Sequence, residues 1–275
     1  MTAAARQKSL VIPREHGAWG ILLVPLVTGA GAGLLAGGSA TRLLPLTVAA
    51  LALFWLRTPV ESWMGTTPIR ACAQSEIRLV RNATLALAAI SIGALLWLFW
   101  GERNPALLAI GAGAAAAFLA QVAVKRTWRS ARTAAQMIGA AGLTSTAPAA
   151  YCAITGGWSA AALGLWGANF LFAVNQIHFV QLRLHAVRAA SRTEKLSLGH
   201  GFLAGQCLLI SLLAAACSLH VFPWYGAVAF LPVLFRGFAW FTAEPQPLAI
   251  SALGKSELAY ACLFGLLLVL VIAIW

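Results

Sequence analysis

Polar side chains recur at helical spacing between residues 175 and 185, within an otherwise apolar stretch. The steps of three or four residues place these side chains on one face of a helix. They belong to Asn175, His178, Gln181 and His185. Because such a face is costly in a membrane unless it meets protein or water, two interpretations stay open. The amide and imidazole groups could bind the polar part of a ligand, or they could hydrogen-bond to neighbouring helices.

A second polar group precedes the first apolar run, where Arg14, Glu15 and His16 bring together a cation, a carboxylate and an imidazole. These charges fit an anchor at the membrane surface beside the N-terminal end of a helix. Alternatively, Glu15 and His16 reach a cavity among the helices. The sequence leaves both interpretations open.

A third group follows the second apolar run, where Pro59 is expected to break the helix because proline lacks a backbone N–H. Glu61 lies two residues later and is one of the few carboxylates on this side of the spans. It could pair with Arg57 four residues earlier, or it could take part in a binding site.

Three basic residues complete the candidate ligand-binding set. Arg236 lies within the eighth apolar run, on the order of 10 Å from its inner end at the helical rise. It could extend to the interface, but an arginine inside a membrane segment is a site candidate by default. Lys125 and Arg126 follow the fourth run and could bind an anionic headgroup. No catalytic residue and no metal ligand is assigned.

The elements that must position these residues are helices in a lipid bilayer. Hydrophobic residues make up 61% of the 275 residues and charged residues only 9%, with a mean hydropathy of +0.84. So few charges cannot cover the surface of a soluble domain. We therefore expect an all-α polytopic transmembrane bundle, a single membrane domain over residues 1–275 in which residues 1–16 precede the first span. About nine spans are expected, at residues 17–37, 43–57, 81–100, 105–124, 134–155, 159–182, 200–220, 224–243 and 257–275.

The positions of lysine and arginine predict the orientation of these spans. With a cytoplasmic N-terminus, seventeen of the 19 basic residues fall on the inner side, and only Arg42 and Arg103 fall on the outer side. This pattern predicts an odd number of spans and an external C-terminus. It also explains the net charge of +12 without nucleic-acid binding, since no basic face is formed. The inner loops are the longer ones, so a ligand-handling surface is expected on the cytoplasmic side.

No cofactor is expected from the sequence. A haem held by two histidines would require two of the five histidines to meet, and their spacing shows no such signature. The five cysteines contain no CxxC pair, and most lie in apolar runs, so they are interpreted as small core residues.

Two inner-side motifs resemble the YwiC-like family of bacterial membrane proteins. They are IPREHGAWG, from Ile12 to Gly20, and LRTPVE, from Leu56 to Glu61. The resemblance is expected to cover the whole chain, and it implies a place in the bacterial cytoplasmic (inner) membrane. It does not imply an activity.

The chain is also similar, more distantly, to the UbiA-type intramembrane prenyltransferases, which have nine spans and a cytoplasmic-side active site. The loop from Lys125 to Thr127 and the segment 136–142 look like their basic loop and glycine-bearing helix, and residues 57–61 and 175–185 fall where their two Asp-rich motifs would lie. Those motifs hold Mg²⁺ ions that bind a diphosphate. All seven acidic residues here are dispersed glutamates, so a Mg²⁺ site is not expected.

The leading hypothesis is a UbiA-like helical scaffold that binds a lipophilic or anionic-headed ligand, such as an isoprenoid or a quinone, at a cytoplasmic-side cavity. One alternative is a divergent prenyltransferase that uses Glu61 and basic residues. The other is a transporter, or a membrane subunit of a larger complex with an unknown partner. Membrane lipid is expected to surround the chain in each case. The sequence does not decide whether the protein is an enzyme.

Overall fold

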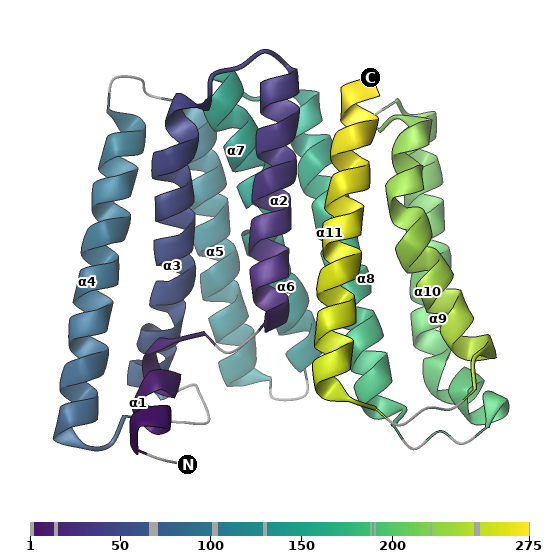
Figure 1. Ribbon diagram of the computed structural model, residues 1–275, viewed down its shortest axis with the longest axis horizontal. Helices are drawn as coiled ribbons and strands as arrows, with labels where there is room; N and C mark the ends of the chain where they lie inside the picture. The colour runs from purple at the N-terminus through teal and green to yellow at the C-terminus, as the bar shows by residue number, and fades with distance from the viewer. Residues whose placement is uncertain are drawn as a thin grey trace. The chain divides into compact units, whose positions relative to one another are not determined.

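The chain is helical throughout the part that the structure, a computed structural model, describes (Figure 1). No strand occurs in that part, and nine of its helical segments are long and apolar enough to cross a membrane. The expected all-α polytopic bundle is thereby confirmed. The described residues are 3–13, 16–65, 71–100, 104–128, 131–187, 189, 191–220, 222–244 and 248–274.

The chain divides into two compact units, which are described separately. Unit 1 comprises Met1–His16 and Ser39–Pro105, and unit 2 comprises Gly17–Gly38 and Ala106–Trp275. The helices of unit 1 are α1 (Ala3–Val11), the 3₁₀ helix η1 (Ala40–Arg42), α3 (Leu43–Met64) and α4 (Gln74–Phe99). Those of unit 2 are α2 (His16–Leu35), α5 (Pro105–Thr127), α6 (Arg132–Thr144), α7 (Thr146–Thr155), α8 (Ala160–His185), α9 (Arg192–Ser218), the 3₁₀ helix η2 (Trp224–Phe230), α10 (Leu231–Thr242) and α11 (Ile250–Ile274).

In unit 1, α3 and α4 pack side by side as a hairpin (Figure 1). The expected break at Pro59 is wrong, because α3 continues through this residue to Met64. A proline removes one backbone N–H from the helix, but the turns on either side of it keep their own hydrogen bonds. Gly65 ends the helix instead. Its φ of 69° lies in the left-handed region, and its N–H donates to the carbonyl of Glu61.

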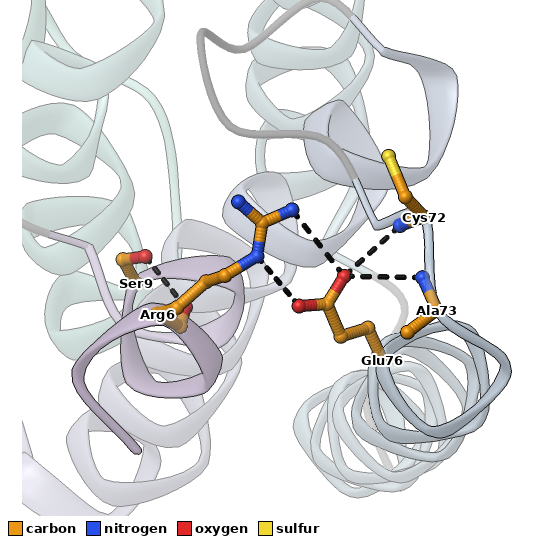
Figure 2. Close-up of polar contacts among 5 residues, drawn as sticks. All are labelled: Arg6, Ser9, Cys72, Ala73 and Glu76. Atoms are coloured by element: carbon orange, nitrogen blue, oxygen red, sulfur yellow. Dashed lines mark hydrogen bonds and ion pairs between the residues drawn. The ribbon is translucent and has the colours of Figure 1, made fainter. Parts of the chain in front are cut away.

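The short helix α1 is joined to the start of α4 by an ion pair, shown in Figure 2. The Nε atom of Arg6 donates to Glu76 Oε1 at 2.6 Å, and this hydrogen bond raises the pKa of the Arg6 guanidinium. The other carboxylate oxygen of Glu76 accepts the backbone N–H groups of Cys72 and Ala73, at 3.0 and 3.3 Å. One carboxylate therefore anchors α1 and also caps the first turn of α4.

The C-terminal end of α1 is held by two side chains of α3. Trp55 Nε1 donates to the carbonyl of Val11 at 2.9 Å, and Ser62 Oγ donates to the carbonyl of Leu10 at 3.1 Å. Both acceptors are carbonyls that a helix end leaves without an intrahelical partner. The Leu10 side chain is fully buried, so α1 is anchored by polar and apolar contacts together.

Several helices begin before the apolar run that predicts them. Helix α4, the third predicted span, starts at Gln74 rather than near residue 81. Helix α9, the seventh predicted span, starts at Arg192 rather than near residue 200. Polar caps explain these extra turns. In α9 the Ser191 hydroxyl accepts the N–H of Glu194, and the Glu194 carboxylate accepts the N–H of Ser191.

Two of the spans in unit 2 are discontinuous. The segment Thr133–Thr155 contains α6 and α7, which are separated at Ser145. The segment Trp224–Thr242 changes at Phe230 from the 3₁₀ helix η2 to α10. A break of this kind leaves backbone groups that need other partners within a membrane.

Helix α2 meets α7 at very close range within unit 2. A Cβ atom added to Gly29 would lie 2.0 Å from the carbonyl oxygen of Ala147, so only glycine fits at this crossing. The Thr146 hydroxyl donates to the carbonyl of Leu22 at 3.0 Å. Thus the start of α7 at the break in its span is joined directly to α2.

Candidate functional site

Seven buried polar side chains are described on helices α8, α9, α10 and α11 of unit 2, and all but Asn169 and Lys195 lie at a common level of the helices. Each is less than 9% exposed, and Gln206 is fully buried. We call the residues at the common level the polar layer. They are Asn175 and Gln176 on α8, Gln206 on α9, Arg236 on α10 and Glu257 on α11.

The polar layer lies between two apolar clusters to which the same four helices contribute. The first cluster includes Phe172, Leu209, Val233 and Ala261, and the second includes Phe179, Phe202, Phe241 and Leu253. On each helix these residues lie three to five positions from the polar layer, about one helical turn away on either side. Apolar packing on both sides excludes water and lowers the local dielectric constant, which strengthens every polar contact within the layer.

Arg236 is the centre of the hydrogen bonds within the layer. Its Nη1 atom donates to Glu257 Oε2, and its Nη2 atom donates to Asn175 Oδ1 at 3.2 Å. The guanidinium carbon lies 4.1 Å from the ring centroid of Phe179 and 4.9 Å from that of Tyr260. The carboxylate and the two aromatic rings thus compensate a buried positive charge.

Five buried atoms of the polar layer have no hydrogen-bond partner in the described structure. They are both amide atoms of Gln206, together with Gln176 Oε1, Arg236 Nε and Glu257 Oε1. Each such group costs about 1–3 kcal/mol when it is buried without a partner. Hydrogen bonds between the helices therefore leave part of the layer unsatisfied, whereas most buried polar groups in proteins have a partner.

Glycines bring the helices of the layer together. A Cβ atom added to Gly237 would lie 2.8 Å from Gln206 Nε2, so α10 approaches the amide of Gln206 closely. A Cβ atom added to Gly205 would lie 3.1 Å from His178 Nδ1. These contacts fix Gln206 and His178 between neighbouring helices.

Lys195 supports α10 from α9, one apolar cluster away from the layer. Its Nζ atom donates to the carbonyls of Trp240 and Ala243, at 3.1 and 2.6 Å, and lies 5.0 Å from the Trp240 ring centroid. The buried ammonium group thereby caps the C-terminal end of the helix that carries Arg236.

The structure brings together Asn175 and Arg236, two of the residues that the sequence singles out. Asn175 is buried, and its Oδ1 atom accepts a hydrogen bond from Arg236. His178 lies one turn further along α8, half-buried, with its ring against Phe202 at a centroid distance of 5.3 Å. Gln181 donates to Gln136 Oε1 on α6 at 3.0 Å. The polar face predicted on α8 is therefore divided between the layer and a contact with α6.

The other candidates lie outside the polar layer. His185 is exposed, and its Nδ1 atom lies 2.7 Å from the carbonyl oxygen of its own helix at position 181. In unit 1, Arg57 Nε donates to Glu61 Oε1 at 3.1 Å, which is the local pair that the spacing allows. At the end of α5, Lys125 is half-buried and Arg126 is exposed. Arg14, Glu15 and the side chain of His16 lie outside the described residues.

Sequence reasoning missed three members of the layer. Gln176 follows Asn175 but falls outside the three- and four-residue spacing of the polar face, and Gln206 is a single amide in an apolar run. Glu257, at the start of the ninth span, is one of the dispersed carboxylates. The available signal was the rarity of polar residues in membrane helices, which applies to all three. Their common partner, Arg236, becomes visible only when the helices are placed together.

A cavity of about 230 Å³ lies at the other end of unit 2. Its lining is mostly apolar and includes Leu35, Tyr151, Ala161 and Phe222. About 20 Å of helix α8 separates Ala161 from Asn175, so this cavity does not adjoin the polar layer. In the described part of the chain, no group of three His, Cys or acidic residues is placed to hold a metal ion.

The fold and the polar layer define a multi-pass helical membrane protein with a buried, incompletely hydrogen-bonded site. A family model for YwiC-like proteins matches residues 12–151, about half of the chain, and the chain belongs to this family. No curated protein and no solved structure matched it. All five residues of the polar layer follow the matched segment, so the layer is defined by the structure and not by the family match.

Proposed function

We propose that this YwiC-like membrane protein binds a lipophilic small molecule in unit 2, with the polar head of the ligand at the polar layer. The observation that carries the proposal is the Gln206 side chain, which is fully buried although its amide oxygen and nitrogen both lack partners. A leucine would fill the same space without this cost. An amide that can both donate and accept is suited to holding a polar group of a ligand.

The surroundings of the layer support a ligand with an apolar tail. The two apolar clusters on either side consist mainly of aromatic and aliphatic side chains, such as Phe172 and Phe202. Isoprenoids and quinones combine a small head with a long apolar chain, and they are the ligand classes that we propose. The similarity to UbiA-type proteins and the divergent-transferase alternative stay predictions.

Lipids that copurify with the protein test this proposal. The wild-type chain is purified from its membranes in detergent and extracted for mass spectrometry, beside the variant Gln206→Leu. A matched control, Gln121→Leu, replaces a buried glutamine of α5 outside the layer. We expect one lipophile, enriched over bulk phospholipid, in the wild type and the control but depleted in Gln206→Leu. Identical lipid profiles in all three would contradict the proposal.

We further propose a location in the bacterial cytoplasmic membrane, with the N-terminus in the cytoplasm and the C-terminus outside. The family and the nine apolar helices support a multi-pass membrane protein. The basic residues, of which seventeen fall toward one side of the spans and two toward the other, favour this orientation. In this proposed orientation, the polar layer lies in the cytoplasmic half of unit 2.

Transport is the second candidate function, and the discontinuous spans favour it. Broken helices often surround the substrate site of a transporter, and one of the two here, Trp224–Thr242, carries Arg236. A single cysteine at Ser145 in a cysteine-free background tests the idea. An alternating-access transporter would be labelled there by an impermeant thiol reagent from both sides of the membrane. Labelling from one side at most would contradict transport through this break.

A further inference from the structure

Building on the proposed function, we infer that the polar layer accepts an uncharged head that carries a hydroxyl group, as in an isoprenoid alcohol or a quinol. The inference selects one of the two ligand classes that the sequence leaves open, lipophilic and anionic-headed. It depends on the charges within the layer and on the unpartnered atoms that remain.

The charges of the layer cancel. Arg236 contributes one positive charge and Glu257 one negative charge, and the two are hydrogen-bonded to each other. The remaining three members are neutral amides. An anionic head would therefore add an uncompensated charge to a site enclosed by apolar clusters, which is strongly unfavourable.

Two further cations, Lys195 and Arg183, lie near the layer but outside its hydrogen bonds. Lys195 is occupied by the carbonyls at the end of α10. Arg183 is half-buried on α8 within the range of the second apolar cluster, which continues to Ala186 and Ala189. Its charge acts on Glu257, but it donates no hydrogen bond to the layer in the part of the chain that the structure describes. About 10 Å of helix separates Arg183 from Gln176. Arg236 therefore keeps Glu257 as its hydrogen-bonded counter-charge.

The unpartnered atoms include donors and acceptors together. Arg236 Nε is a donor, Glu257 Oε1 and Gln176 Oε1 are acceptors, and the Gln206 amide supplies one of each whichever way it is oriented. A hydroxyl group both donates and accepts, so it can pair with both kinds. A phosphate ester that is fully ionised only accepts, and it would leave the carboxylate and amide oxygens without partners.

Three probes with the same isoprenoid chain separate these requirements. Farnesol is uncharged, and its hydroxyl group can both donate and accept a hydrogen bond. Farnesyl methyl ether is uncharged but can only accept one. Farnesyl phosphate is anionic. Saturable binding of each is measured on the full-length chain in detergent micelles. We expect farnesol to bind about tenfold more tightly than either of the others, since each leaves buried groups of the site without partners.

The outcomes separate this inference from the proposed function. If farnesyl phosphate binds more tightly than farnesol, the inference that the head is uncharged is wrong. If farnesyl methyl ether binds as tightly as farnesol, the inference that the head carries a hydroxyl group is wrong. Either result would still leave a binding site for a lipophile. Absence of saturable binding by all three would contradict the proposed function, and this inference would fall with it.

Two variants assign the selectivity to named side chains. Glu257→Gln leaves Arg236 without its counter-charge, so we expect the preference to shift by about tenfold toward farnesyl phosphate. The control Glu244→Gln makes the same change at an exposed position and should leave the preference unchanged.

The second variant, Gln206→Leu, should lower farnesol affinity by about tenfold. It tests the assignment independently, also in the case that Glu257→Gln does not fold. Unchanged farnesol affinity in Gln206→Leu would overturn the assignment.

Discussion

The Gln206 amide carries an energetic cost that its contacts in the described structure do not offset. It is fully buried, and neither of its polar atoms has a partner in the described structure. Natural proteins retain such costs chiefly at functional sites, where stability is lost in exchange for binding or catalysis. The neighbouring Gln176 differs, because its Nε2 atom donates to the carbonyl of Glu257 at 2.8 Å. Because Gln176 has one partnered and one unpartnered polar atom, the two glutamines should respond differently to the same substitution.

We expect Gln206→Leu to stabilise the ligand-free protein by about 2–6 kcal/mol, since leucine removes two unpartnered buried groups. We expect Gln176→Leu to change stability much less, since it removes one unpartnered acceptor but also loses the hydrogen bond to the carbonyl of Glu257. Thermal unfolding of delipidated protein in detergent measures both. A loss of stability in Gln206→Leu would show that its amide has partners after all.

Arg236 and Glu257 should be strongly coupled. Removing one partner, as in Arg236→Met or Glu257→Leu, leaves a buried charge alone and should destabilise the protein by about 3–5 kcal/mol. The double variant removes both charges and should be less destabilised than either single variant. A double-mutant cycle on unfolding in detergent measures the coupling, and additive effects would argue against a direct pair.

Helix α1 is the element whose attachment depends most clearly on a few side chains. Arg6, Trp55 and Ser62 join it to α3 and α4 through hydrogen bonds at its two ends. The Arg6 side chain is 41% exposed, so its pair with Glu76 contributes little to the stability of the fold. The carboxylate has a second role at the start of α4, and the two roles can be separated.

Hydrogen exchange can separate the two roles of Glu76. In Arg6→Met we expect faster amide exchange in α1 only, because the cap of α4 keeps its carboxylate. In Glu76→Gln we expect faster exchange in α1 and in the first turn of α4, because the N–H groups of Cys72 and Ala73 lose a charged acceptor. Equal exchange patterns in both variants would refute the shared anchor.

For the whole molecule, we expect the two ends of the chain to lie on opposite sides of the membrane. Seventeen of the 19 basic residues flank the spans on the side of the N-terminus, and nine spans reverse the side. Reporter fusions that are active only in the cytoplasm measure this directly. A fusion at the N-terminus should be active and one at the C-terminus inactive, and a cytoplasmic C-terminus would contradict the proposed orientation.

The membrane spans could be predicted from hydropathy, because an apolar run of about 20 residues has few other uses. Their ends could not, since caps such as Ser191 with Glu194 add polar turns that hydropathy does not detect. Pro59 shows the same limit, because whether a proline ends a helix depends on the residues that follow it and not on the proline alone.

The candidate site could be predicted only in part. Asn175 and Arg236 were found because polar groups in a span demand an explanation, and the same reasoning applies to Gln206 and Glu257. What the sequence does not contain is the pairing. Arg236 and Glu257 are 21 positions apart on different helices, and only helix packing brings them into contact. The apolar clusters that enclose the layer are likewise a product of tertiary structure.

The central claim is that the polar layer holds the head of a lipophile, and an experimental density map of the protein purified from its own membranes tests it most directly. The account predicts an elongated density between α8, α9, α10 and α11, with its polar end within hydrogen-bond distance of Gln206. Density for isolated water molecules alone beside Gln206, Arg236 Nε and Glu257 Oε1, with no chain extending from them, would contradict it.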